Sequence, residues 1–347
     1  MKLEKKIIDV CGNGHSGHSA LVDLLGEVKD VHTHYSLYHF ELFRQPGGII
    51  DLIRSMDNDW SEITFDYNYK KFDSLVRKIL AGIENNVGRN SRNIIKEFQD
   101  KIISGYLETD WFDDLNFNKD YITKLKSRIL TLLRHKKDKI LKRNRFYPSS
   151  KVYQYNASFS LKEIEEFINK LLFHGQEESI QSVVLNNSLE PYKRSKYILD
   201  AVPNFYSITV LRDPRDIYAS LYTDNVFKRD FERNDKSFNF YYLNEQRKGF
   251  LGANDISTFI ERQKVSRSNL LDHPRNLIIN FEDLIKDYNK TVTRVFDFLG
   301  FKKEDHIFKH HRLDPSKSIK NIGLWKKSSK EKEIKLITKE LYSYINE

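Results

Sequence analysis

The chain has 347 residues, of which 39% are hydrophobic, so it is long enough to bury one large core or two smaller ones. Its only cysteine, Cys11, excludes an internal disulfide, and we expect it to be a buried core residue. No apolar run approaches the roughly 20 residues that a membrane span needs, and the first strand begins too early to leave room for a signal peptide. These features predict a cytoplasmic protein, and the abundance of lysine, asparagine and isoleucine fits a prokaryotic origin.

The amino terminus predicts a strand, a glycine-rich turn and a helix. Residues 6–11 form a short apolar run, residues 12–19 read Gly-Asn-Gly-His-Ser-Gly-His-Ser, and residues 20–25 have helical spacing. Glycines let successive N–H groups point inward, and a helix amino terminus adds partial positive charge. The turn is therefore interpreted as a phosphate cradle, with an ordinary strand–helix connection as the alternative. It lacks the Gly-Lys-[Ser/Thr] of nucleoside triphosphatases.

A histidine-rich stretch follows this unit. Alternation predicts a second strand near residues 31–35, which includes His34. His39 and Glu41 lie just beyond that strand. Each of the three is either a structural polar residue or a functional one, since function occupies few of the titratable groups in a cleft.

Residues 58–150 are rich in helix formers and contain few strand signals, so we expect a largely helical insertion. Within it, residues 119–145 contain eleven Lys or Arg and two Asp, a net charge of +9 that equals the charge of the whole chain. Their apolar residues lie mostly on one face, which predicts a basic amphipathic helix. This helix is interpreted as a solvated face, as an attractant for anionic acceptors, or as a contact with a membrane surface. No specific nucleic-acid motif accompanies the charge.

Strand signals resume around residues 151–156 and again at residues 182–185, where the strand ends on Asn186 and Asn187. The clearest signal is at residues 205–216. An apolar, β-branched run stops at Arg212, and Asp213-Pro214-Arg215-Asp216 has the features of a helix start. Arg212 is thus expected at the carboxyl end of a strand, where α/β sheets bind ligands. Ser220 is expected on the same helix face as Asp213.

Two interpretations of the Arg212 region stay open on these residues alone. The arginines and aspartates of residues 212–216 neutralise one another at a helix cap, or Arg212 and Ser220 share a bound phosphate.

A last strand near 276–281 and a closing helix after Ser329 complete the pattern. The sequence therefore predicts a single α/β domain over residues 1–347, with a central, mostly parallel sheet flanked by helices and the insertion at 58–150.

The turn at 12–19 and the Arg212 segment, in this order, resemble the PAPS-dependent sulfotransferase family, PAPS being 3′-phosphoadenosine 5′-phosphosulfate. Residues 276–285 are similar to the family's last strand with its Tyr-Glu-Asp-Leu turn, and residues 318–327 resemble its carboxy-terminal loop over the nucleotide. The resemblance covers about residues 6–55 and 180–327. It implies a P-loop-like core.

The resemblance also implies roles for individual residues. The cradle would hold the 5′-phosphosulfate, and Arg212 with Ser220, at the family's spacing, would hold the 3′-phosphate. The implied donor-binding residues are Gly12, Asn13, Gly14, His15, Ser16, Gly17, His18, Ser19, Arg212, Ser220, Lys320, Asn321, Gly323 and Trp325. The implied catalytic residues are His15, at the leaving phosphate, and His39 or Glu41 as the base.

The implied activity is in-line transfer of a sulfuryl group from PAPS to a hydroxyl or amine, without a metal, leaving 3′,5′-adenosine bisphosphate. A carbohydrate acceptor is expected, with an anionic glycan as one option, because the later motifs look more like those of carbohydrate-type members. Family members have Lys or Arg at His15 and Thr at His18, so the alternative is a nucleotide- or anion-binding protein that has lost transfer activity. An ATP-dependent kinase is a weaker alternative, because no P-loop lysine is present.

Overall fold

The computed structural model describes residues 5–34, 39–56, 60–109, 150–223 and 256–345. The basic segment 119–145 lies outside the described residues.

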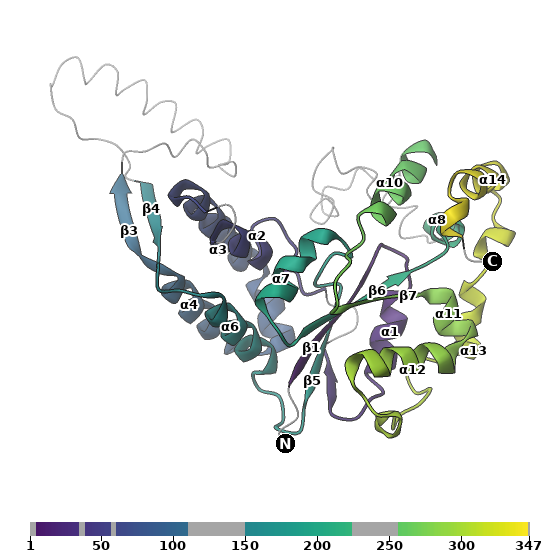
Figure 1. Cartoon of the computed structure of the whole chain (residues 1–347), viewed down its shortest axis with the longest axis horizontal. Coiled ribbons are helices and arrows are strands. Elements are labelled where there is room, and N and C mark those ends of the chain that lie inside the picture. Colours follow the sequence, from purple (N-terminus) through teal and green to yellow (C-terminus); the bar gives the residue numbers. More distant parts are fainter. Residues whose placement is uncertain (1–4, 35–38, 57–59, 110–149, 224–255, 346–347) are drawn as a thin grey trace, which may run out of the picture.

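A five-stranded sheet forms the centre of the molecule (Figure 1). Its strand order is β2-β5-β1-β6-β7, and all the paired strands are parallel. The strands are β1 (Lys6–Gly12), β2 (Val31–Thr33), β5 (Ser182–Asn186), β6 (Phe205–Leu211) and β7 (Asn276–Asn280). This arrangement confirms the predicted α/β fold class. The strand expected near 31–35 ends at residue 33, and the other four lie where the sequence indicated.

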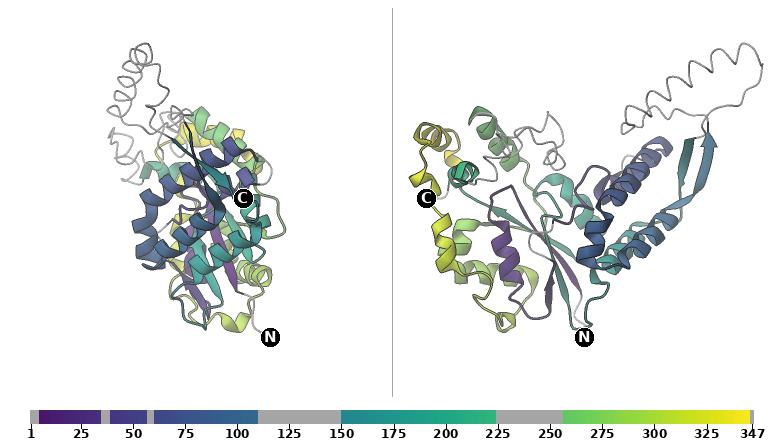
Figure 2. Two further views of the ribbon diagram at one scale, coloured as in Figure 1. Left: turned by 90° about the vertical axis from the view of Figure 1, so that its left-hand side faces the viewer. Right: turned by 180° about the vertical axis from the view of Figure 1, so that it is seen from behind.

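Helices cover both faces of the sheet, because alternate strand residues point to opposite sides. Ile8 and Val10 of β1 pack with α1 (His18–Leu25), α11 (Phe281–Lys286) and α12 (Tyr288–Leu299). Ile7 belongs to the core on the other face, which includes α2 (Ile49–Met56), α6 (Leu161–Phe173) and α7 (Lys196–Ala201). Figure 2 shows these layers from two further sides. The two cores fix the strand ends relative to one another.

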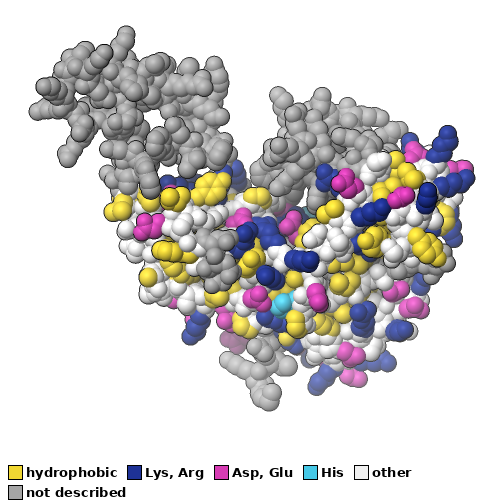
Figure 3. Space-filling model, turned by 45° about the horizontal axis from the view of Figure 1, so that its top comes forward, with side chains coloured by type: hydrophobic (Ala, Val, Ile, Leu, Met, Phe, Trp, Pro, Cys, Tyr) yellow, Lys and Arg dark blue, Asp and Glu magenta, His cyan; other side chains and the backbone are white. Residues whose placement is uncertain are grey.

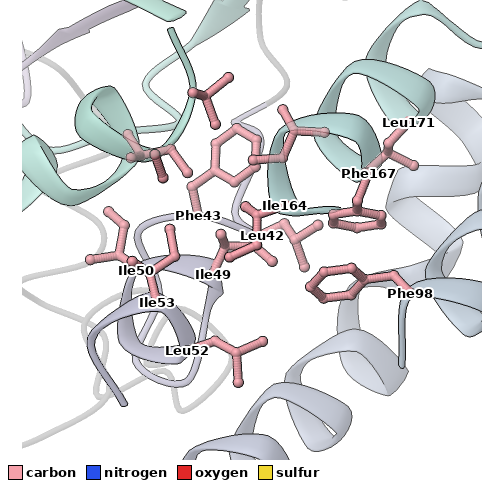
Figure 4. Packing of buried hydrophobic residues seen from close by; sticks show 14 of the residues in the cluster. Leu42, Phe43, Ile49, Ile50, Leu52, Ile53, Phe98, Ile164, Phe167 and Leu171 are labelled. Carbon is pink, nitrogen blue, oxygen red and sulfur yellow. The ribbon is translucent and has the colours of Figure 1, made fainter. Parts of the chain in front are cut away.

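Two long helices and a hairpin extend the second core. They are α3 (Glu62–Val87), α4 (Ser91–Ile102), β3 (Ile103–Thr109) and β4 (Ser150–Tyr155). The ring centroids of Phe98 and Phe167 stack 4.0 Å apart where α4 meets α6 (Figure 4). The sequence predicted a strand near 151–156 but gave no sign of its partner. β4 pairs antiparallel with β3 and lies outside the central sheet.

The carboxy-terminal third adds a smaller core beside β6. In it, residues of α8 (Pro214–Thr223), α10 (Ile256–Ser268) and α14 (Glu331–Glu340) pack together. The remaining elements are short: η2 (Lys193–Ser195), η5 (Lys303–Asp305), α13 (Pro315–Ser318), η6 (Ile319–Asn321), η7 (Leu324–Lys327) and η8 (Tyr342–Tyr344). Of the helices in the described ranges, none has both the length and the apolar character that a membrane crossing requires.

Candidate functional site

The turn between β1 and α1 is tightly built and requires glycine at two places. A Cβ on Gly12 would lie 2.7 Å from the carbonyl oxygen of Val210. Gly17 has a φ of 82°, and a Cβ there would lie 2.4 Å from the ring of Phe281. The backbone therefore passes close to β6 and α11, and it leads directly into the amino terminus of α1. Such a turn presents N–H groups to an anion.

His15 occupies the left-handed region in this turn, with a φ of 63°. Side chains other than glycine rarely adopt that conformation, and strain of this kind concentrates at ligand sites. The N–H of the next residue, Ser16, donates to the carbonyl of Asn13 at 2.9 Å, which closes the turn. The carbonyl of His15 accepts from Arg212 at 2.8 Å. The turn is thus connected to the end of β6.

Arg212 follows β6 and is 7% exposed. Its Nη1 donates to the His15 carbonyl, its Nη2 donates to the Asn321 carbonyl at 2.5 Å, and its Cζ lies 5.2 Å from the Phe281 ring centroid. Among the described residues, Nε has no partner and no carboxylate lies within 4.0 Å of the guanidinium. Burial lowers the pKa of Arg212, against the opposing effect of Asp216, Glu282 and Asp213. This cation is buried and bound chiefly to carbonyl groups.

The neighbouring charges of α8 have other partners. Arg215 forms an ion pair with Asp213 at 2.6 Å, and the Asp213 carboxylate accepts the Arg215 N–H at 2.8 Å. The ion-pair interpretation of this segment therefore applies to Arg215 rather than to Arg212. The Ser220 hydroxyl is buried and donates to the Ile217 carbonyl within its own helix at 2.9 Å.

The carboxy-terminal loop is fastened to the first turn of α8. Asp216 is 1% exposed and accepts the N–H groups of Gly323 at 2.8 Å and Trp325 at 3.1 Å. The guanidinium carbon of Arg215 lies 4.2 Å from the Trp325 ring centroid. Lys320 and Asn321 are exposed. Turn, strand end and loop, which are distant in sequence, thus meet at Arg212.

His18, the first residue of α1, lies close to His39. The ring centroids of His18 and His39 are 6.2 Å apart, and the His39 backbone pairs with Asn186 at the end of β5. The pKa of His18 is lowered to about 3 and the pKa of His39 to about 4, in both cases chiefly by burial and with Arg44 acting in the same direction. Both rings are therefore neutral near pH 7. The described residues hold no cluster of three or more His, Cys, Asp or Glu suited to a metal ion.

The Glu41 side chain is buried and has two polar partners. It pairs with Arg44 at 2.8 Å and accepts a hydrogen bond from Gln45. Burial raises the pKa of Glu41, whereas Arg44 lowers it. Of the two candidate bases, His39 is the one without an ion pair among the described residues.

Several residues that support the turn and the neighbouring strand ends were not predicted from the sequence. Tyr192 donates to Oδ1 of Asn13 at 2.8 Å, and Nδ2 of Asn13 donates to the Ser266 hydroxyl at 2.7 Å. Asp9, fully buried in β1, accepts the N–H of Ser188 at 2.7 Å, and its pKa is raised to about 6 by burial. The one available signal was Asp9 itself, an acid inside an apolar strand.

The pH dependence of the unfolding free energy tests whether a buried histidine is neutral, and His34 is suited to this test. Its Nδ1 donates to the Asn86 carbonyl at 3.0 Å, and its pKa is lowered to about 4, chiefly by burial. The unfolded chain takes up the proton first as the pH falls below about 6.5, so the folded state loses stability down to about pH 4. In His34→Asn, the amide replaces Nδ1 and does not titrate. We expect its unfolding free energy to depend less on pH between 5 and 6, by about 1 kcal/mol per pH unit.

Urea unfolding at several pH values measures this slope, with His311→Asn, at an exposed position, as the matched control. Equal slopes for His34→Asn and the wild-type chain would contradict the neutral, buried state of His34.

The structure defines an α/β protein in which a glycine-rich turn is joined to the buried Arg212 at the end of β6. Residues 201–341 match the sulfotransferase domain family. The match spans less than half of the chain and includes Arg212, Ser220 and the 319–327 loop. It agrees with the resemblance to sulfotransferases that the sequence motifs indicated. No curated protein sequence matches the chain.

Solved structures of sulfotransferases are similar at low identity. One is the sulfotransferase domain from the curacin biosynthetic pathway, with 12% identity, 99% of each chain covered and a TM-score of 0.39. A second is sulfotransferase STF1 of Mycobacterium tuberculosis, with 13% identity, 92% of this chain and 77% of that chain covered, and a TM-score of 0.35. A third is retinol dehydratase in complex with retinol and PAP, with 14% identity, coverage of 99% and 82%, and a TM-score of 0.32.

Proposed function

We propose that this chain transfers the sulfuryl group of PAPS to a hydroxyl or amine of an acceptor, and that the acceptor is a carbohydrate. The observation that carries the proposal is the position of Arg212. Its buried guanidinium links the cradle at His15 to the carboxy-terminal loop at Asn321. A donor with a phosphosulfate at one end and a 3′-phosphate at the other needs these elements side by side.

The residues present fit such a donor. The crowding behind Gly12 and Gly17 keeps the cradle backbone close to β6 and α11, with the start of α1 next to it. The unpartnered Nε of Arg212 is a buried donor that a phosphate oxygen would satisfy. PAPS, when bound, supplies an activated sulfuryl group and a phosphate leaving group.

The chain's own groups then have separate tasks. The N–H groups of the cradle orient the phosphosulfate, and they stabilise charge without needing to reorganise. His15 donates a hydrogen bond to the leaving phosphate, in place of the lysine or arginine usual in the family. His39, whose pKa of about 4 keeps it neutral, accepts the proton of the acceptor. Holding donor and acceptor in line supplies the remaining rate enhancement.

The insertion at 58–150 is proposed to cap the acceptor side. Its described helices α3 and α4 extend the core on the side of the sheet where α2 and α7 lie. On the face shown in Figure 3, Lys and Arg side chains and Asp and Glu side chains are both present and lie among one another. Such mixed charge suits a polar acceptor that offers hydroxyl and anionic groups.

Transfer of radiolabelled sulfate from PAPS to a panel of glycans, with binding of 3′,5′-adenosine bisphosphate measured in parallel, tests the proposal. Labelled product is the expected result. The substitutions at His15 and His18 favour one second candidate, a binding protein that has lost transfer. Tight binding of the bisphosphate with no product on any acceptor would establish that candidate instead, and binding of neither nucleotide would overturn both.

A further inference from the structure

Four buried polar atoms near the carboxyl end of β6 have no hydrogen-bond partner in the described part of the chain. They are Nε of Arg212, Nε of Arg267, Oε1 of Gln263 and Oε2 of Glu282. Gln263 and Arg267 are four residues apart on α10 and therefore share a face. Native proteins leave few such atoms unpaired, so four in one region indicate a place for water or a ligand.

Arg267 lies against the Arg212 segment. Its Nη2 donates to the carbonyl of Arg212 at 2.6 Å, and its Cζ lies 5.7 Å from the Tyr344 ring centroid. No carboxylate of the described residues lies within 4.0 Å of its guanidinium. Burial lowers the pKa of Arg267, and Glu282 and Asp213 oppose that effect. Both arginines thus lie near the same two acids without forming an ion pair with them.

The carboxylates of Asp213 and Glu282 already have other polar partners. The Asp213 carboxylate pairs with Arg215, and Oε1 of Glu282 accepts the N–H of Asp213 at 2.9 Å. Burial raises the pKa of Glu282, which favours its neutral form. Asp216, the acid that acts most strongly on Arg212, accepts the N–H groups of Gly323 and Trp325. Among the described residues, the guanidinium groups of Arg212 and Arg267 therefore have no carboxylate partner of their own.

α10 is also fixed relative to the cradle. Ser266, the residue before Arg267, accepts a hydrogen bond from Asn13 at 2.7 Å and lies 3.1 Å from the Tyr192 hydroxyl. The chain after α10 pairs with the segment at Tyr192 through Leu270. These contacts hold α10 next to the cradle, and the guanidinium of Arg267 lies at the strand end through its hydrogen bond to the Arg212 carbonyl.

We propose that Arg267 is a second cationic ligand of the donor's 3′-phosphate, beside Arg212. The inference rests on the proposed function, which supplies the donor. A phosphate monoester carries close to two negative charges and several acceptor oxygens, and guanidinium groups bind such oxygens with paired N–H groups. A single arginine would leave part of that charge uncompensated in a buried place.

The test compares two nucleotides that differ only in the 3′-phosphate, 3′,5′-adenosine bisphosphate and adenosine 5′-monophosphate, by calorimetry. In Arg267→Met, we expect the bisphosphate to bind about 10 to 100 times more weakly, with the monophosphate little changed. Arg267→Lys should restore part of the preference for the bisphosphate over the monophosphate. Lys264→Met removes a charge from the same helix, at an exposed residue paired with Glu340, and should leave the preference unchanged.

The outcomes separate this inference from the proposed function. A wild-type chain with no preference for the bisphosphate would overturn the proposed function and, with it, the role of Arg267. A wild-type preference that Arg267→Met retains would overturn the role of Arg267 alone. If both nucleotides weaken equally in Arg267→Met while the thermal unfolding midpoint falls, Arg267 only supports the Arg212 carbonyl, and the inference fails.

Discussion

Arg212→Met is expected to weaken the binding of 3′,5′-adenosine bisphosphate by about 100-fold, because it removes a buried guanidinium from the 3′-phosphate site. Two effects combine in this variant. Charge-assisted hydrogen bonds to the phosphate are lost, and so is the connection between the cradle at His15 and the loop at Asn321. Calorimetric titration of the folded variant measures the change.

Two further variants separate the loss of the phosphate contact from the other effects of removing an arginine. Arg212→Lys keeps the charge without the paired N–H groups and should bind with intermediate affinity. Arg92→Met removes an exposed guanidinium of α4 that pairs with Glu84, and it should bind like the wild-type chain. Unchanged affinity in Arg212→Met would mean that the 3′-phosphate binds elsewhere.

Local patterns in the sequence predicted the parts of the fold that this site depends on. The apolar run at 205–211 and the proline after Asp213 correctly placed the end of β6 and the start of α8. The glycines at 12, 14 and 17 located the turn before α1, which begins two residues earlier than expected. These signals are local, since an apolar run, a cap and a glycine each act on adjacent backbone.

The contacts that complete the site join distant segments, and periodicity does not reveal such pairs. Tyr192 and Ser266 meet at Asn13, although each comes from a separate part of the chain. β3 escaped prediction because its partner β4 follows more than 40 residues later. A strand's pairing depends on what packs against it, so a single segment carries little of that information.

The buried acid of β1 shows how a core residue can affect the site. Asp9 accepts hydrogen bonds from Ser188 and Leu189, which follow the end of β5. Asn187, between the end of β5 and Ser188, has a φ of 53°, and its N–H donates to the Val10 carbonyl at 2.8 Å. The adjacent Asn186 pairs with the His39 backbone. The candidate base therefore depends on a strand end that a carboxylate inside the core holds in place.

His39→Asn is expected to lower kcat for sulfuryl transfer by about 10² to 10⁴, with little change in donor affinity, because the variant lacks the group that accepts the acceptor's proton. The pKa of His39 is about 4, so the wild-type base is active above that pH. The wild-type kcat/KM should stay level from pH 8 to about 5 and fall about tenfold per pH unit below about 4. Initial rates with labelled PAPS across this range measure both quantities.

Glu41→Gln separates the two candidate bases. Glutamine keeps an oxygen that accepts from Arg44, so the fold around β2 and α2 should persist while the carboxylate is lost. We expect this variant to retain most of the wild-type kcat and the level pH profile, because Glu41 is already paired. If Glu41→Gln loses activity and His39→Asn keeps it, the base is Glu41, and the neutral ring of His39 serves only to pack against His18.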